Sequence, residues 1–194
     1  MGHISQMPLL ELRSKYGLDL AIETGTQHCQ GTLDLLKYFH WVYTIEIDPL
    51  RWSTAYIMLQ EFAGARCLLG NSPDVLDIIL KNPDKPNNIL FWLDAHFPGD
   101  LFDKNDLNWN EKVALPLMEE LKIILHHRGK LWLEKKCQDV IIIDDARIYK
   151  KADYQYGNWE HCYDNTDFLL PFYATHEVKL DLRETGAYIL TPIQ

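Results

Sequence analysis

Short, nearly continuous apolar runs recur along most of the chain, and segments of mixed polarity separate them. The runs cover residues 18–22, 41–47, 65–69, 89–93 and 140–143. Runs of this kind are typical of parallel strands that are covered on both faces. We therefore predict five strands of one central sheet at these positions.

The segments between the runs carry apolar residues at spacings of three and four, which indicates amphipathic helices. The clearest of these patterns cover residues 33–39 and 52–62. Pro49 follows Asp48 and Pro73 follows Ser72, so each proline would stand at the first helical position. We expect Asp48 and Ser72 to cap, with their side chains, the helices that begin at Pro49 and Pro73.

A further helix is predicted over residues 115–125, with Pro116 at its start. The pair Glu119-Glu120 is expected on its solvent side. His126 and His127 follow, just before Gly129, and we interpret them as charges at the end of a helix that the glycine terminates.

The last part of the chain has a different pattern. Residues 175–182 alternate apolar and polar positions, residues 183–186 form a short turn signal, and residues 187–190 run back. Five strand-helix repeats followed by this hairpin predict an α/β fold. Its core is a doubly wound, Rossmann-like, mostly parallel sheet of seven strands that ends in an antiparallel hairpin.

We expect residues 1–194 to form one domain, with a helical segment at residues 1–17. Residues 97–112 are polar and exceed an ordinary connection in length, which makes them a candidate lid over a substrate. The aromatic residues within this segment could equally anchor it to its own domain.

The charge balance limits the partners of the protein. The chain has 28 Asp and Glu against 19 Lys and Arg, a formal net charge of −9. Nucleic acid is therefore an unfavourable main partner, because a protein that binds it needs a basic face. No apolar run reaches the length of a membrane span, and no targeting signal opens the chain. We expect a soluble, cytoplasmic protein that does not bind a membrane.

Acidic residues follow nearly every predicted strand. They are Glu23, Glu46, Asp94, Asp144 and Asp145. In open parallel sheets, ligands bind beyond the carboxyl ends of the strands. Five carboxylates at one edge would repel one another, so we expect a cation, or the hydroxyl and amino groups of a ligand, to compensate them. The alternative is that each acid only caps the helix that follows.

The spacing of two of these acids favours a ligand that contains a nucleoside. Glu46 follows Glu23 by 23 residues, close to the spacing at which an acid after the second strand binds ribose hydroxyls. The backbone amides after Glu23, at the start of the first helix, would accept an anion. The next glycine after Gly25 is Gly31, so the glycine pattern of NAD-binding loops is absent and NAD is disfavoured.

Five segments together resemble class I S-adenosylmethionine-dependent methyltransferases. They are residues 22–26 (IETGT), 44–48 (TIEID), 70–72 (GNS), 91–96 (FWLDAH) and 142–147 (IIDDAR). The resemblance implies that Glu23 lies near the methionine amino group of the cofactor. It also implies that Gly25 and Thr26 let the methionyl part approach, and that Glu46 binds the ribose. Asn71 and Ser72 would face the adenine, and Asp94 would complete the cofactor site.

Within that class, the segments LDAH and IDD are similar to the metal-dependent O-methyltransferases of the macrocin and novobiocin type. The resemblance implies a magnesium ion held by Asp94, Asp144 and Asp145. A hard cation of this kind can bind a substrate hydroxyl and lower its pKa. His96 would be the general base.

Other roles for these residues stay open. Asp145 could be the base in place of His96, or it could orient Arg147. His96 could instead be a histidine that is only hydrogen-bonded at the sheet edge. Arg147 could bind a substrate carboxylate or form a structural ion pair.

We conclude from the sequence that methyl transfer from S-adenosylmethionine to a hydroxyl of a small molecule is the leading hypothesis. Aromatic residues within 149–163 are candidates for the wall of the acceptor pocket. The rivals are a protein, tRNA or lipid-linked sugar acceptor, a cofactor-binding module without turnover, and an NAD-linked sugar enzyme. A homodimer through residues 4–16 or through the aromatic stretch is the candidate assembly.

Overall fold

The computed structural model describes residues 4–96, 115–160 and 162–193. The candidate lid at 97–112 therefore lies outside the described residues. Seven strands form one sheet in the order β3-β2-β1-β4-β5-β7-β6. The strands are β1 (Leu20–Thr24), β2 (Trp41–Glu46), β3 (Ala65–Leu69), β4 (Ile89–Leu93), β5 (Val140–Ile143), β6 (His176–Asp181) and β7 (Ala187–Pro192). Strands β1 to β5 are parallel, and β7 runs antiparallel to β5 and β6.

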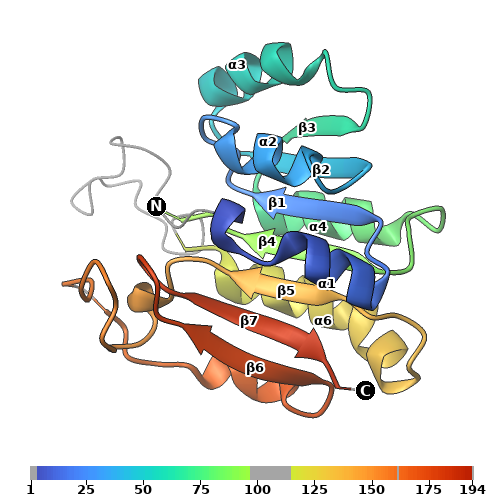
Figure 1. The fold of residues 1–194 in the computed structure, drawn as a ribbon. Coiled ribbons are helices and arrows are strands. Elements are labelled where there is room, and N and C mark those ends of the chain that lie inside the picture. Colours follow the sequence, from blue (N-terminus) through green and yellow to red (C-terminus); the bar gives the residue numbers. More distant parts are fainter. Residues whose placement is uncertain (1–3, 97–114, 161, 194) are drawn as a thin grey trace.

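Helices cover both faces of this sheet (Figure 1). One face carries α1 (Leu9–Tyr16) and α2 (Gln30–Leu36), and the other carries α4 (Ser72–Lys81) and α6 (Leu117–Leu133). Helix α3 (Pro49–Leu59) packs beside the edge strand β3. The described residues also contain three short 3-10 helices: η1 (Ile4–Gln6), η2 (Ala146–Ile148) and η3 (Asp167–Phe172).

Alternation along the buried strands divides the core into two layers. In β4, Ile89, Phe91 and Leu93 pack with the residues of α4 and α6. Leu90 and Trp92 point to the opposite face and pack with the residues of α1 and α2. This alternation follows from the pleat of the strand, and it explains why β4 is apolar at every position.

The predicted architecture is confirmed: a mostly parallel, seven-stranded sheet with a C-terminal antiparallel hairpin. The first strand begins at Leu20, two residues later than expected. Asp48 caps α3 as predicted, because its carboxylate accepts hydrogen bonds from the amides of Leu50 and Arg51. No helix in the described ranges combines the length and the apolar composition that crossing a membrane requires.

The prediction for α6 was wrong in two respects. The helix does not end at Gly129 but continues to Leu133, because Ile124, Arg128 and Trp132 follow one another at intervals of four residues and are all buried. His127 does not cap a helix end: its Nε2 lies 2.8 Å from Asp77 Oδ1 on α4. The second error concerns Glu120, which is fully buried and does not face solvent.

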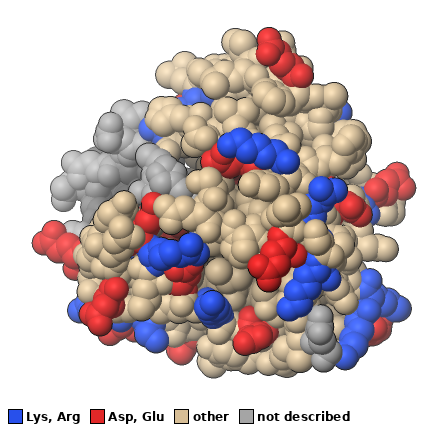
Figure 2. Space-filling view, viewed as in Figure 1, with Lys and Arg blue, Asp and Glu red and all other residues tan. Residues whose placement is uncertain are grey.

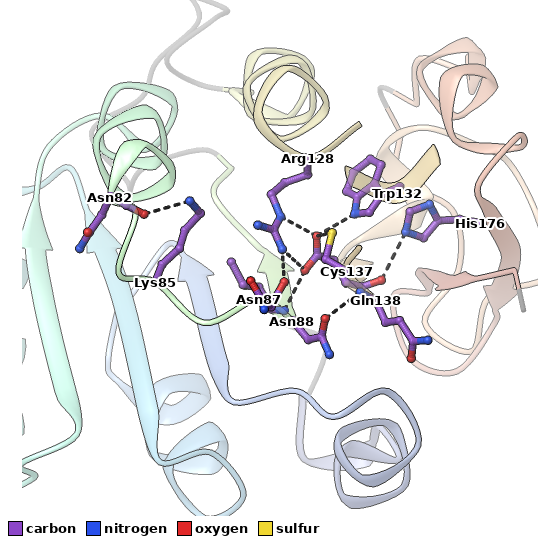
Figure 3. A network of polar contacts seen from close by, with 11 residues as sticks. Asn82, Lys85, Asn87, Asn88, Arg128, Trp132, Cys137, Gln138 and His176 are labelled. Carbon is purple, nitrogen blue, oxygen red and sulfur yellow. Dashed lines mark hydrogen bonds and ion pairs between the residues drawn. The ribbon is translucent and has the colours of Figure 1, made fainter. Parts of the chain in front are cut away.

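A buried polar network lies at the amino-terminal ends of β4 and β5, away from the acidic strand ends (Figure 3). Arg128 Nε donates to Asp139 Oδ2 at 2.7 Å, and Arg128 Nη2 donates to Asp139 Oδ1 at 2.8 Å. Trp132 Nε1 and the amide of Ile89 also donate to the Asp139 carboxylate. The network joins α6 to the starts of two central strands and pairs a charge that would be costly to bury alone.

Lys and Arg do not gather into one patch on the face that Figure 2 shows. They alternate there with Asp and Glu, mostly over the lower half of the view. This mixed distribution agrees with the acidic net charge of the chain and offers no continuous basic surface on that face.

Candidate functional site

A cleft opens at the carboxyl ends of β1, β2, β3 and β4. The order of the sheet reverses between β1 and β4, and a doubly wound sheet places its ligands at this reversal. Six of the predicted site residues line the cleft: Gly25, Glu46, Asn71, Ser72, Asp94 and His96. Arg51, which the sequence analysis did not single out, lines it as well.

A second cavity lies on the other side of the chain segment that follows β1. Glu23 and Thr26 line it, together with Gly25 and Asp94, which are shared with the cleft. Glu23 and Thr26 are thus close to the cleft without lining it.

Gly25 allows two strand ends to approach each other closely. Its φ is +85°, and a β-carbon at this position would stand 2.7 Å from the carbonyl oxygen of Asp94. Any other residue would push apart the backbone segments that follow β1 and β4.

Glu46 holds the loop that follows β1. Its Oε2 accepts a hydrogen bond from the amide of Gln27 at 2.9 Å, and its Oε1 accepts one from the amide of Asp48 at 3.0 Å. Each carboxylate oxygen can accept a second donor. Glu46 is therefore fixed in place, lines the cleft, and retains acceptor capacity for the hydroxyls of a ligand.

Glu23 is buried in a cage of hydroxyl groups. Its Oε2 accepts hydrogen bonds from the hydroxyls of Thr32 and Thr44, the latter at 2.7 Å. Burial raises the pKa of Glu23 to about 8, although both hydroxyl contacts oppose the shift. At pH 7 the carboxyl group of Glu23 is thus mostly protonated and uncharged. This removes one of the five negative charges that were expected to repel one another.

The amides expected to bind an anion after Glu23 are already engaged. The amides of Gly25 and Thr26 both donate to the carbonyl of Ile45, and α2 begins only at Gln30. The sequence pattern did not reveal this, because these hydrogen bonds depend on the pairing of β1 with β2.

Asp94 and Asp145 are brought together by His96. The Nε2 atom of His96 lies 3.1 Å from Asp94 Oδ1 and 3.1 Å from Asp145 Oδ2. Burial alone would lower the pKa of His96, but the hydrogen bonds to Asp145 and Asp94 raise it to about 10. In this arrangement the ring is a cation at neutral pH and compensates two of the strand-end carboxylates.

The backbone at Asp145 is strained, with a φ of +52°. Arg147 Nε lies 3.0 Å from Asp145 Oδ1. Arg147 thus forms a structural ion pair, one of the two roles that the sequence left open for it. The turn between β6 and β7 supports the segment, because the amide of Ala146 donates to the carbonyl of Gly186. Burial raises the pKa of Asp145, but the hydrogen bond from His96 and its charge bring that pKa below its ordinary value.

Asp144 does not join the other two predicted metal ligands. It lines a separate small cavity with Gln6 and Arg183, and its buried Oδ2 has no hydrogen-bond partner among the described residues. Burial, followed by the charges of Asp94 and Asp145, raises its pKa well above the ordinary value. The described residues contain no group of three ligands that could hold a metal ion. The arrangement therefore does not fit magnesium unless His96 leaves the place between the two carboxylates.

Ser72 does not cap α4 as predicted, since Asn71 takes the N-cap position. The Ser72 hydroxyl instead contacts Oε1 of the buried Glu120 on α6. Sequence reasoning missed Glu120 because it stands beside the acidic Glu119. The signal was its position, three residues after Leu117 and four before Ile124, on the face of the helix that packs on the sheet.

A cavity of about 270 Å³ lies beside the start of α6. Leu115 and Leu117 line it, and Pro116 between them lines the cleft, so the two spaces are neighbours. Tyr149 and Tyr163 contribute its aromatic wall. Two members of the predicted aromatic stretch thus lie next to the cleft.

Comparisons with protein-family models and with curated proteins find no match to this sequence. Solved structures do match. A Staphylococcus aureus protein assigned as a caffeoyl-CoA O-methyltransferase has a TM-score of 0.59 at 11% identity, with 95% of this chain and 81% of that chain covered. The Podospora anserina methyltransferase PaMTH1, solved with S-adenosylhomocysteine (SAH), has a TM-score of 0.59 at 12% identity, with 96% and 76% covered.

An rRNA methylase from Streptococcus thermophilus matches with a TM-score of 0.54 at 13% identity, with 96% of this chain and 93% of that chain covered. At these identities the matches concern the fold alone. The strand order, the terminal hairpin and the three matches together show that the chain has the class I methyltransferase fold.

Proposed function

We propose that the protein is an S-adenosylmethionine-dependent methyltransferase whose acceptor is a hydroxyl group of a small molecule. The observation that carries the proposal is the cleft at the β1–β4 reversal. Gly25 and Asp94 line it, and Glu46 offers carboxylate oxygens to a ribose. Asn71 and Ser72 stand across the same cleft, where the adenine would lie.

The cavity beside the cleft supports a small acceptor. Its volume of about 270 Å³ is near the lower limit for small-molecule sites, and tyrosines and leucines line it. The acidic net charge disfavours the RNA acceptor that the rRNA methylase acts on. A protein or lipid-linked sugar acceptor, and a binding module without turnover, are the alternatives to be tested.

His96 lines the cleft and is our candidate for the residue that acts on the acceptor oxygen. A protonated ring would stabilise negative charge that develops on that oxygen, and a ring that has lost its proton would act as the predicted general base. Asp145 is the other candidate base. Methyl transfer otherwise requires mainly that the acceptor oxygen and the methyl group are aligned.

A requirement for magnesium is a prediction from the resemblance. Asp94 and Asp145 would have to exchange His96 for the metal, and Asp144 would have to turn toward them. Turnover that is unchanged by a chelator would contradict the requirement.

The first experiment is calorimetric titration of the protein with S-adenosylmethionine, SAH and NAD, with and without magnesium. We expect saturable binding of the first two ligands and none of NAD. A screen of small hydroxyl compounds, with SAH release as the readout, then tests turnover. Binding without release of SAH from any acceptor would favour the binding module, and absence of binding would contradict the proposal.

A further inference from the structure

Glu120 is a fully buried carboxylate that the chemistry above does not use. It lies on α6 with none of its surface exposed, whereas its neighbour Glu119 pairs at the surface with Lys122 at 2.8 Å. A carboxylate is costly to bury without partners, so its contacts indicate what it does.

The contacts of Glu120 lead to the cleft. Its Oε1 bonds the hydroxyl of Ser72, which is buried at the first turn of α4 and lines the cleft. The hydroxyl of Thr24, at the end of β1, is close enough to Glu120 to lower the pKa of its carboxyl, while Glu120 Oε2 has no hydrogen-bond partner among the described residues. Thr24 Oγ1 in turn accepts a hydrogen bond from the amide of Asp94 at 3.3 Å. Glu120 therefore connects α6 with the start of α4 and lies near the end of β1, whose Thr24 contacts the segment after β4.

A serine hydroxyl has one hydrogen to donate and oxygen lone pairs to accept with. An ionised carboxylate only accepts hydrogen bonds, so the Ser72 hydrogen points to Glu120. The oxygen of Ser72 is then left as an acceptor toward the cleft.

We propose that Glu120 is a positioning residue of the cofactor site, which directs the Ser72 hydroxyl so that its oxygen accepts a hydrogen bond from a donor group of the cofactor. This inference rests on the proposed function, because it takes S-adenosylmethionine or SAH as the occupant of the cleft. It assigns a role to a residue outside the strand ends.

The charge state of Glu120 sets the conditions of the test. Burial raises its pKa to about 7, the hydroxyls of Ser72 and Thr24 oppose this shift, and Asp94 adds to it while His96 opposes it. Burial, and after it the negative charge of Glu120, raises the pKa of the nearby Tyr149 phenol. At pH 8.5 Glu120 is mostly ionised and the Ser72 hydrogen is committed to it.

The test is calorimetric titration with SAH at pH 8.5. The proteins compared are the wild type, Glu120→Leu, Ser72→Ala and the double variant. We expect each single substitution to weaken SAH binding about tenfold, the value of one hydrogen bond. Glu120→Leu should have no further effect in the Ser72→Ala background, whereas a purely structural role would weaken binding in both backgrounds. Glu134→Gln, which removes a carboxylate at the far end of α6, is the matched control and should bind like the wild type.

The outcomes separate this inference from the proposed function. A wild type that does not bind SAH contradicts the proposed function itself. If the wild type binds SAH, two results overturn the inference alone. One is that Glu120→Leu binds SAH as tightly as the wild type. The other is that the two substitutions weaken binding by factors that multiply in the double variant. Thermal unfolding checks that each variant is folded. If Glu120→Leu does not fold, Ser72→Ala decides, because wild-type affinity in that variant also overturns the inference.

Discussion

The α-carbon of Gly31 lies against the buried carboxylate of Glu23. A β-carbon built on Gly31 would stand 2.1 Å from Glu23 Oε1, while Thr32 and Thr44 hold the other carboxylate oxygen. Gly31 is required here for space and not for an unusual backbone angle. The residue after the start of α2 thus determines whether the acid at the end of β1 can be buried.

Gly31→Ala should therefore destabilise the protein. The added methyl group cannot be accommodated unless Glu23 leaves its two threonine partners, so we expect the free energy of unfolding to fall by about 1–3 kcal/mol. Urea denaturation measures the change. Gly129→Ala on α6 is the control: its nearest atom would be Leu125 Cδ1 at 3.1 Å, the end of a flexible side chain, and a helical alanine is favoured over glycine. A Gly31→Ala protein as stable as the wild type would contradict this account.

The raised pKa of Glu23 makes stability depend on pH. Glu23 binds its proton more tightly in the folded protein, with a pKa of about 8, than in the unfolded chain, with an ordinary value of 4.5. The stability that protonated Glu23 contributes to the folded protein is fully present below pH 4.5 and is lost as pH rises toward 8. Between pH 5 and pH 8, the wild type should lose at least about 1.4 kcal/mol of stability relative to Glu23→Gln, a tenfold change in the folding equilibrium. Parallel stability curves for the two proteins would refute this.

His96 should carry a positive charge across the neutral range. With a pKa of about 10, its ring resonances in NMR spectra should not titrate between pH 6 and pH 8. Asp145→Asn removes one of the two carboxylates and should lower the pKa of His96. A midpoint near 6.5 in the wild type would show that the ring does not bridge Asp94 and Asp145 in solution.

The pair of Arg128 and Asp139 should be essential for folding stability. Asp139→Asn leaves Arg128 as a buried charge without its carboxylate partner, which costs about 3–5 kcal/mol. Asp181→Asn is the matched control, because its partner Arg183 is half exposed, and it should cost no more than about 1 kcal/mol. Chemical denaturation of the two variants gives both values, and equal losses would count against a special role for the network in Figure 3.

Prediction from the sequence worked best where local pattern and burial agree. The apolar runs at 65–69, 89–93 and 140–143 match β3, β4 and β5 residue for residue. Prediction failed at α6, where Gly129 lies inside the helix and Glu120 lies in the core. Both errors have one cause: packing against α4 and the sheet stabilises residues whose local preference favours a helix end or a surface.

The sequence by itself determined the order of the elements and the edge of the sheet at which the acids gather, because hydrophobic periodicity and chain connectivity are local properties. Only the tertiary structure decided how those acids are compensated. Glu23 is near neutrality in a cage of threonines, Glu46 is bound by backbone amides, and Asp94 and Asp145 share His96. These outcomes depend on burial and on distances between residues far apart in the chain, and both exist only once the sheet has formed.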